Sequence, residues 1–477
     1  MDTIKKVLIA NRGEIALRII RACKELGVKS VALYSEVDTE GVWVQKADEA
    51  YRLSGDPVAA YLDECKIIDI AKRTLCDAIH PGYGFLSESA EFTEACEESG
   101  IIFIGPSAEH IALFGDKMAA KIAMKEVGVP VLEGTVEPVT SAKEGERIAK
   151  EIGLPVIIKA AFGGGGRGMR IVHDEKDFQE LFESATNEAI KYFGKGEVFI
   201  EKFVQNPRHI EVQIIADKYG HVVHLGERDC SIQRRHQKVI EIAPSPRLNE
   251  TTREKLYATA VNAVKKIGYE SVGTVEFLVD DNDEIYFIEM NTRVQVEHPV
   301  TEIVSGIDII QRMIEIAGGD KLKYTQDEIL LRGYAIEFRI NAENPENNFM
   351  PAVGMISNYM APGGPGVRLD TSIYAGYKIP ANYDSMVGKL IVYALDWDGA
   401  VKKAMRALDE FYIDGIITNI PLHKAIVTDS DFKAGKFNTS YLEKKLPTFD
   451  FQANQPTRSR KIEDKSFILK GSDDILY

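Results

Sequence analysis

Two adjacent segments near the middle of the chain constrain its fold more than any others. Gly273–Val279 (GTVEFLV) is typical of a β-strand, and the DDND that follows it is a turn signal. Tyr286–Thr301 (YFIEMNTRVQVEHPVT) then alternates polar and apolar residues with the period of two that a strand requires. We therefore predict a β-hairpin centred just after Asn282, which places Glu276 directly opposite Glu289.

The second strand of this hairpin is predicted to have one polar face and one apolar face. After Phe287 the polar face carries Glu289, Asn291, Arg293, Gln295 and Glu297, and the other carries Ile288, Met290, Thr292, Val294 and Val296. Like charges directly opposite each other repel, and a divalent cation between Glu276 and Glu289 would turn that repulsion into binding energy. Two carboxylates and the Asn291 carbonyl suit Mg²⁺. The alternative is a solvated face whose charges are unrelated.

Length and composition limit the class of protein. A chain of 477 residues exceeds one ordinary hydrophobic core, so we expect two or three domains. The net charge of −15 argues against nucleic acid as a partner, because nucleic acid requires a basic surface. No apolar run is long enough to span a membrane, no secretory signal is recognisable, and the five cysteines lack metal-ligand spacing. We expect a cytoplasmic protein with reduced thiols and no membrane contact.

The order of predicted elements divides the chain into three domains and a tail. Residues 1–115 alternate strand and helix signals, which predicts a Rossmann-like parallel sheet, although NRGE is not a dinucleotide fingerprint. Residues 116–330 carry the polar segments and form a central domain, with a small α+β lid at about 131–203. Residues 331–446 form a C-terminal α+β domain, and 447–477 a weakly packed tail. The predicted fold class is therefore α/β combined with α+β.

A glycine-rich segment, Phe162–Met169 (FGGGGRGM), lies between two strand-like runs in the predicted lid. A hairpin of this kind is a mobile lid, not a Walker loop, which needs GK[ST] at the start of a helix. Its glycines let backbone N–H groups approach phosphate oxygens, and Arg167 adds positive charge. Lys159, at the end of the preceding strand, would reach the same anion. A flexible loop without a ligand is the alternative.

Three further segments carry candidate binding groups. Lys117 precedes a helical run and is either a phosphate contact or a surface charge. Val198–Val204 (VFIEKFV) is typical of a strand whose backbone supplies adenine with a donor and an acceptor, or of a plain edge strand. In ERDCSIQRRHQKVIE, strand alternation places Arg234, His236 and Lys238 on one cationic face, and a solvated basic loop is the alternative. Together these parts predict an ATP–Mg²⁺ site with a second, small anionic substrate.

The chain resembles the biotin carboxylases, which are ATP-grasp enzymes of the biotin-dependent carboxylases. The motifs that carry the resemblance span residues 1 to about 446 and are VLIANRGEIALRIIRACKELG, AIHPGYGFLSE, FIGPS, GDKMAAK, KAAFGGGGRGMR, ERDCSIQRRHQK, GTVEFL, FIEMNTRVQVEHPVTE, RINAENP and YDSMVGKL. The resemblance implies ATP- and bicarbonate-dependent carboxylation of biotin on a separate carrier protein through carboxyphosphate. That is the first half-reaction of an acetyl-CoA carboxylase or a two-subunit pyruvate carboxylase.

The resemblance also implies a role for each matching residue. Its nucleotide contacts match Lys117, Lys159, Gly165, Gly166, Glu201, Lys202, Phe203, Val204, His209, Gln233, His236, Glu276 and Glu289. Two metal ions, Mg²⁺ or Mn²⁺, would be held by Glu276, Glu289 and Asn291. Bicarbonate would bind Lys238, Arg293, Gln295 and Val296, with Glu297 as the general base and Arg339 facing the biotin ureido group.

This assignment agrees with elementary acid–base chemistry. Bicarbonate is a far weaker acid than a free Glu side chain, whose pKa is about 4.3, so Glu297 cannot deprotonate it unaided. A permanently cationic Arg293 would stabilise the developing charge. A closed lid would exclude the water that destroys carboxyphosphate.

Some features fit the resemblance less directly, and other interpretations of the site remain open. Phe162 stands where acetyl-CoA carboxylase versions commonly have a small residue, which favours the pyruvate type. The biotin-accepting AMKM is absent, and AMKE at 123–126 fits a helix, so the carrier and carboxyltransferase are expected to be separate chains, with a homodimer of this one. The alternatives are a carbamoyl- or amide-forming ATP-grasp ligase, which typically has two ATP units in the carbamoyl case, and a regulatory subunit with a dead site.

Overall fold

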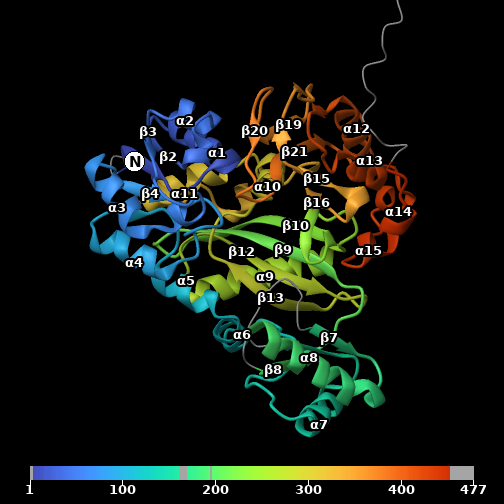
Figure 1. Cartoon of the computed structure of the whole chain (residues 1–477). Coiled ribbons are helices and arrows are strands. Elements are labelled where there is room, and N and C mark those ends of the chain that lie inside the picture. Colours follow the sequence, from blue (N-terminus) through green and yellow to red (C-terminus); the bar gives the residue numbers. More distant parts are fainter. Residues whose placement is uncertain (1–3, 161–168, 194–195, 452–477) are drawn as a thin grey trace, which may run out of the picture.

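The computed structural model describes residues 4–160, 169–193 and 196–451. Its N-terminal part (blue in Figure 1) contains a five-stranded parallel sheet in the order β3-β2-β1-β4-β5. The strands are β1 (Lys6–Ile9), β2 (Lys29–Tyr34), β3 (Glu49–Arg52), β4 (Ala78–His80) and β5 (Ile102–Phe103). The helices are α1 (Gly13–Glu25), α2 (Val42–Lys46), α3 (Glu64–Arg73), α4 (Ala90–Glu98) and α5 (Ala108–Gly115). The predicted Rossmann-like sheet is confirmed.

Strand β1 shows why this sheet is covered on two faces. Val7 and Ile9 belong to the same buried cluster as Ile19 of α1, whereas Leu8 belongs to the cluster that contains Phe92 of α4. Successive strand residues point to opposite faces, so an unbroken apolar run such as VLIA buries both of them.

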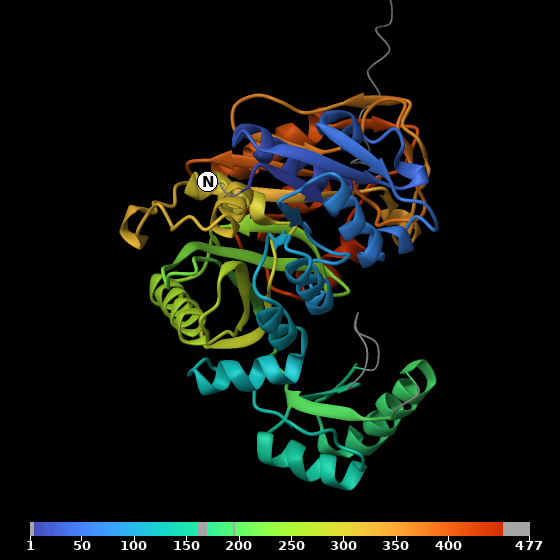
Figure 2. The ribbon, with the colours of Figure 1, turned by 90° about the vertical axis from the view of Figure 1, so that its left-hand side faces the viewer.

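A small three-stranded antiparallel sheet projects from the body as a separate lobe (Figures 1 and 2), reached through α6 (Lys117–Glu126). Its strands are β6 (Val156–Ala160), β7 (Met169–Val172) and β8 (Val198–Lys202), and its helices are α7 (Ala142–Ile152) and α8 (Phe178–Phe193). Phe178 and Phe182 of α8 pack with Ile158 and Ile200 of the sheet in a core of their own. The strands predicted to flank the glycine loop therefore form and pair, and the loop itself lies outside the described residues.

An eight-stranded sheet, in the order β13-β12-β9-β10-β11-β14-β21-β19, is the main sheet of the rest of the molecule. Its strands are β9 (Arg208–Ala216), β10 (Val222–Arg234), β11 (Gln237–Ala243), β12 (Ser271–Val279), β13 (Ile285–Asn291), β14 (Tyr334–Asn341), β19 (Val367–Thr371) and β21 (Met386–Ala394). Strand β11 pairs with β14 from Ile240↔Phe338 to Ala243↔Ala335. The sheet thus continues without interruption across the boundary predicted at 330.

Helices and short strands complete this larger body. The helices are α9 (Glu250–Ile267), α10 (His298–Ser305), α11 (Ile309–Ala317), α12 (Trp397–Glu410), α13 (Ile420–Thr428), α14 (Ser430–Lys433) and α15 (Tyr441–Lys445). The short strands are β15 (Glu343–Asn344), β16 (Met350–Pro351), β17 (Gly354–Met355), β18 (Asn358–Met360), β20 (Lys378–Ile379) and β22 (Tyr412–Asp414). No helix within the described ranges is long and apolar enough to cross a membrane.

The side chains of β14 alternate between the hydrophobic core and the opposite, charged face of the sheet. Ile336, Phe338 and Ile340 belong to the largest buried cluster, together with residues of α12 and α13. The residues between them, Glu337 and Arg339, point to the opposite face of the sheet. One strand therefore anchors a hydrophobic core on one side and supplies charged groups on the other.

The predicted hairpin forms between β12 and β13, and Glu276 pairs directly with Glu289 as expected. Two details differ from the prediction. Phe277 pairs with Phe287, so Ile288 is an extra residue that forms a β-bulge, and the turn is centred on Asn282. The strand also ends at Asn291, so the alternation predicted as far as Thr301 is not strand structure beyond that point.

Candidate active site

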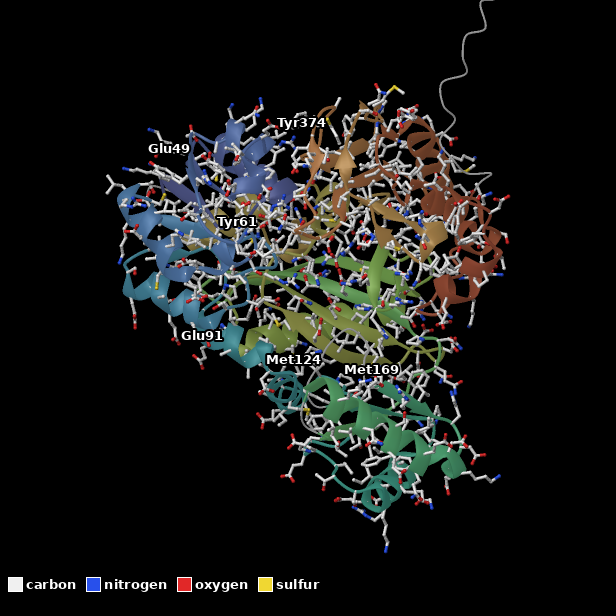
Figure 3. All side chains as sticks on the ribbon, in the orientation of Figure 1. Glu49, Tyr61, Glu91, Met124, Met169 and Tyr374 are labelled. Carbon is white, nitrogen blue, oxygen red and sulfur yellow. The ribbon has the colours of Figure 1, made fainter. Side chains whose placement is uncertain are left out.

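A large cleft lies where the N-terminal part, the small sheet and the eight-stranded sheet come together. Its volume is about 2330 Å³, well above the roughly 300–1,000 Å³ of a site for one small ligand. Tyr83 lines it from the loop after β4, Lys159 from β6, Glu289 from β13 and Arg339 from β14. Met169 of β7, labelled in Figure 3, lines it from the lobe. The cleft has room for more than one substrate.

The two predicted metal-binding carboxylates lie side by side on one wall of this cleft. Asn291 Nδ2 donates to Glu276 Oε1 at 2.8 Å. Burial and the charge of Glu276 raise the pKa of Glu289, as expected of one anion beside another. Burial also pushes the pKa of Glu276 upward, but Lys238 and His209 outweigh it and hold that pKa well below its ordinary value. A divalent cation would relieve the repulsion at Glu289.

Lys238 lies at the centre of the charged cluster. Its Nζ donates to Glu211 at 2.5 Å, to Glu297 at 2.6 Å and to Glu276 at 3.1 Å. Burial alone lowers the pKa of Lys238, but the three carboxylates outweigh it and raise the pKa well above its ordinary value. Lys238 therefore stays protonated, and its ammonium group holds the three carboxylates together.

Glu297 lies between two cations at the start of α10. Arg339 Nη2 donates to its second oxygen at 3.0 Å, opposite the Lys238 contact. Burial raises the pKa of Glu297, but Lys238 and Arg339 outweigh it and the pKa falls well below its ordinary value. Arg339 Nε also donates to Glu241. Burial raises the pKa of Glu241 to about 7 in spite of this contact.

The loop from Thr292 to Val296 brings the predicted residues Arg293, Gln295 and Val296 to the cleft without strand geometry. Arg293 Nη2 donates to Asn291 Oδ1 at 2.8 Å, and its Nε lies 3.0 Å from Glu88 Oε2. Gln295 Nε2 donates to Glu276 Oε1 at 2.7 Å. The residues in direct contact with Glu297 are thus Lys238 and Arg339, and Arg293 contributes through its charge at longer range.

The lobe and helix α6, which leads to it, contribute a second group of charges. Lys121 Nζ donates to Glu201 Oε1 at 2.8 Å, and Lys159 donates to the other oxygen of the same carboxylate. Burial raises the pKa of Glu201, but Lys159 and Lys121 outweigh it and lower the pKa below its ordinary value. Lys117 lines the same cleft at the start of α6, whose first N–H groups are capped by Asp116. Two of these lysines therefore share one internal carboxylate.

The chain between the lobe and the sheet carries the residues expected to contact the base. Phe203 N–H donates to Pro155 O at 3.0 Å and Lys202 N–H to Glu133 O at 2.8 Å, while Val204 lines the cleft. The Lys202 Nζ donates to Gly153 O at 2.8 Å, so this side chain braces the lobe. Gly165 and Gly166 lie outside the described residues.

Gln233 and His209 form a series of hydrogen bonds that ends at the Glu276 carboxylate. Gln233 Nε2 lies 2.8 Å from His209 Nδ1, and His209 Nε2 lies 2.6 Å from Glu276 Oε2. This series fixes the orientation of both the imidazole and the Glu276 carboxylate. The predicted residues His209, Gln233, His236, Gln295 and Val296 all line the cleft.

The prediction that Arg234, His236 and Lys238 share one strand face is wrong. Arg234 pairs with Gln237 across a two-residue turn in which Arg235 and His236 have φ of 50° and 64°. A turn of this kind reverses the chain, so the three side chains diverge. Arg234 Nη2 donates to Asn348 Oδ1 at 3.0 Å, whereas Lys238 points into the buried acids.

Sequence reasoning missed several buried partners of these residues. Arg228 is fully buried, and its Nη2 donates to Gln295 Oε1 at 2.7 Å and its Nη1 to Thr301 Oγ1 at 2.9 Å. Its Nε donates to Glu211, which also accepts from Lys238. A signal was present, because ERDC and HIEVQ place charges within otherwise apolar strands. Such charges are rarely buried unless they are paired.

Comparison with known proteins decides the family. Residues 3–111 match the model of the biotin carboxylase N-terminal domain. Residues 116–325 match that of the ATP-binding domain of the carbamoyl-phosphate synthase L chain, and residues 337–444 that of the biotin carboxylase C-terminal domain. The chain belongs to the biotin carboxylase family. The predicted ATP-grasp enzyme class is thereby confirmed.

Similar proteins agree over almost the whole length. A biotin carboxylase of Pseudomonas aeruginosa is 53% identical over 93% of this chain and 99% of its own. A pyruvate carboxylase subunit of Methanothermobacter thermautotrophicus is 49% identical over 92% of this chain and 89% of its own. The biotin carboxylase domain dimer of Hydrogenobacter thermophilus 2-oxoglutarate carboxylase, solved with MgADP, ADP and bicarbonate, has a TM-score of 0.88 at 51% identity, covering 94% of this chain and 99% of that chain.

Proposed function

We propose that this chain uses ATP and bicarbonate to carboxylate biotin on a separate carrier protein, through carboxyphosphate and with release of ADP. The observation that carries the proposal is the buried series Lys238–Glu297–Arg339, which lies beside the paired carboxylates Glu276 and Glu289. A cation that binds an anion, a carboxylate that accepts a proton and an arginine that stabilises an oxyanion are the groups this reaction requires.

The donor set fits a magnesium or manganese site. Glu276 and Glu289 face one another, and the pKa of Glu289 is raised by burial and by that neighbour, so a cation is favoured between them. We propose that two ions bind Glu276, Glu289 and Asn291, and that they neutralise the phosphate charge of the nucleotide. Asn291 Oδ1 accepts from Arg293 in this structure, so metal binding by that oxygen would exchange one cation for another.

On the nucleotide side we propose that Lys117 and Lys159 bind the phosphates and that the glycine loop, with Gly165 and Gly166, closes over them. Lys159 pairs with Glu201 here, so the nucleotide would replace an internal carboxylate. The backbone at 201–204 would hold the adenine, and His209, Gln233 and His236 would complete the nucleotide contacts, all from positions that line the cleft.

Bicarbonate would bind Lys238, Arg293, Gln295 and the backbone of Val296. Glu297 would be its base, although Lys238 and Arg339 together keep the pKa of this carboxyl low and its basicity weak. When Lys238 turns to the substrate anion, Glu297 loses a contact at 2.6 Å, and its pKa rises toward that of a useful base. Substrate binding would thus activate the base, and Arg293 would stabilise the charge that develops.

In the second step carboxyphosphate would break down to CO2 and phosphate, and that phosphate would take the ureido proton of biotin while Arg339 steadies the ureido oxygen. The deprotonated nitrogen would then attack CO2 to form carboxybiotin. The Arg339 guanidinium is already oriented by Glu241 on one side and Glu297 on the other. A fixed cation of this kind needs no reorganisation when the oxyanion forms.

We also propose the domain division 1–115, 116–330 with a lid at about 131–203, 331–446 and a tail at 447–477, of which residues 452–477 lie outside the described part of the chain. The parallel sheet of β1–β5 and the three-stranded sheet of the lobe support the first domain and the lid, whereas the eight-stranded sheet spans the boundary at 330. As partners we propose a biotin carboxyl carrier or a biotinylated carboxyltransferase subunit, and a second copy of this chain in a cytoplasmic homodimer. A dimer was solved for the Hydrogenobacter relative.

Free biotin and labelled bicarbonate test the function directly. The purified chain with Mg²⁺ and ATP should form labelled carboxybiotin and release ADP in step with it. An amide- or carbamoyl-forming ligase would transfer the label to an added amine and not to biotin, and a regulatory subunit would yield neither product. A panel of biotinylated partners offered acetyl-CoA, pyruvate or 2-oxoglutarate would then identify the final acceptor.

A further inference from the structure

Two buried carboxylates face one another across the ladder between β11 and β14. Glu337 pairs directly with Glu241, and both are 0% exposed. Side chains directly opposite in an antiparallel ladder lie roughly 4.5–5.5 Å apart. Neither oxygen of Glu337 has a hydrogen-bond partner among the described residues, and the same holds for Oε2 of Glu241. Two adjacent carboxylates in a dry environment are not both ionised.

Every element packed against Glu337 on this face contributes a charged or titratable group. They are Arg339 on β14, Glu241 on β11, Lys389 on β21, Glu297 before α10 and Tyr83 in the loop after β4. On α10, which packs against β14, His298 Nδ1 lies 2.6 Å from Gln295 O, and Glu302 accepts from Arg18 and Arg368. The apolar face of β14 is covered by α12 and α13.

The two neighbouring cations are committed elsewhere. Arg339 donates Nε to Glu241 and Nη2 to Glu297. Lys389 Nζ donates to Val296 O at 2.8 Å and lies 3.1 Å from Glu14 Oε1. Glu337 therefore has two nearby cations in its field but a hydrogen bond from neither, which is an environment for an un-ionised acid.

We propose that Glu337 is a neutral carboxylic acid that keeps Arg339 aimed at the reacting groups. While it retains its proton, Arg339 has one anion on each side, Glu241 and Glu297. If Glu337 ionised, a second anion would stand next to Glu241 and draw the guanidinium away from Glu297. Glu337 is thus a positioning residue, and its role rests on the proposed function, in which Arg339 steadies the ureido oxygen of biotin.

The electrostatics point the same way. Burial raises the pKa of Glu337 well above its ordinary value, and the neighbouring Glu241 raises it further, against the opposing field of Lys389. Since the folded-state pKa is raised, Glu337 stays protonated as pH rises through the ordinary carboxyl range and ionises at higher pH. Carboxylation of biotin would then lose rate there. ADP release with bicarbonate but without biotin would be affected less, because it does not need the Arg339–ureido contact.

The test compares wild type with Glu337→Gln, which keeps the shape and has no proton to lose. Glu337→Met is a second variant of similar size, and its side chain is apolar. The control is Glu315→Gln, because Glu315 of α11 is also buried but pairs with Arg312 and Lys323 and does not line the cleft. Rates of carboxylation of free biotin, and of biotin-free ADP release, are measured against pH.

We expect the alkaline fall of the carboxylation rate to be present in wild type and in the control, and to be absent or shifted to higher pH in both Glu337 variants. An unchanged alkaline fall in Glu337→Gln overturns the proposal. Infrared spectroscopy at neutral pH gives an independent measurement, since wild type should show the C=O band of a buried protonated carboxyl that Glu337→Gln lacks, and the same band intensity in both also overturns it. Failure of wild type to carboxylate biotin at any pH would instead refute the proposed function, and the infrared result would still decide the state of Glu337.

Discussion

Replacing Lys238 with methionine leaves three buried carboxylates without their shared cation. In the native structure its Nζ lies 2.5 Å from Glu211, 2.6 Å from Glu297 and 3.1 Å from Glu276. Removal of one partner from a buried ion pair costs about 3–5 kcal/mol. Each carboxylate keeps another donor, because Arg228 contacts Glu211, Arg339 contacts Glu297 and His209 contacts Glu276. We therefore expect a loss of about 3–5 kcal/mol for the whole cluster, not three times that amount.

The pH dependence separates this cause from loss of packing. In wild type the folded pKa values of Glu276 and Glu297 are lowered, so these groups add stability above their unfolded pKa of about 4.3, and that stability is lost as pH falls. Without Lys238, only His209 opposes burial at Glu276 and only Arg339 and Arg228 oppose it at Glu297, so we expect both pKa values to rise. The variant should then lose stability relative to wild type as pH rises. The difference in stability between wild type and Lys238→Met should grow from about pH 5 to about pH 8.

Thermal unfolding followed by circular dichroism across this range measures the difference. Lys255→Met is the matched control, because Lys255 lies 2.6 Å from Glu284 with the two side chains 43% and 58% exposed. An exposed pair of this kind contributes about 0–1 kcal/mol and little pH dependence. Equal losses in the two variants, or a loss in Lys238→Met that shrinks as pH rises, would refute the electrostatic reasoning.

Three further predictions concern the reaction. Glu297→Gln and Arg293→Ala should abolish carboxylation while MgATP still binds, measured by calorimetry; a loss of nucleotide affinity as large as that of Lys159→Ala would contradict both roles. Glu289→Gln should raise the Mg²⁺ concentration needed for half-maximal rate at least tenfold, a loss of about 1.4 kcal/mol, whereas Glu284→Gln at the exposed end of the same hairpin should leave the metal titration unchanged. Lys159→Ala should raise the KM for ATP more than it lowers kcat, and an unchanged KM would remove Lys159 from the phosphate site.

The hairpin shows how far local sequence patterns reach. The turn signal and strand periodicity predicted the pairing of Glu276 with Glu289, and in the structure the bulge at Ile288 compensates for a turn centred earlier than predicted. The bulge at Ile288 was not predictable from the pattern of the hairpin, because it lies next to a contact with a distant segment: Phe287 N–H donates to Pro130 O at 2.8 Å, and Phe287 forms a bridge with Val131. The alternation after Asn291 is a loop in which Gln295 is held by Glu276 and Arg228, so the polar residues converge for a different reason than the one predicted.

Contacts between residues of different strands could not be predicted from local sequence patterns. Glu211, Arg228 and Glu241 belong to β9, β10 and β11, and their contacts depend on the order in which strands join the eight-stranded sheet. That order is set by long-range pairing, which periodicity within one segment does not encode. The same holds for β14, whose Arg339 reaches Glu297 because β14 joins β11 across the predicted domain boundary. Arg339 was predicted as a site residue only from the family resemblance, and the pairing of β14 with β11 explains its position.

Acidic side chains inside this cleft affect how it can bind anionic substrates. The main cations that line it are already paired with internal carboxylates: Lys159 with Glu201, Lys238 with Glu297, and Arg339 with Glu241. Burying a bare cation is far more expensive than burying a pair, so each carboxylate holds its cation in place until a substrate anion arrives. ATP or bicarbonate must then exchange with a carboxylate that is already desolvated. If bicarbonate binds Lys238 as we propose, the freed carboxylate becomes a stronger base as its cation leaves, so the binding of bicarbonate and the activation of Glu297 would be one electrostatic event.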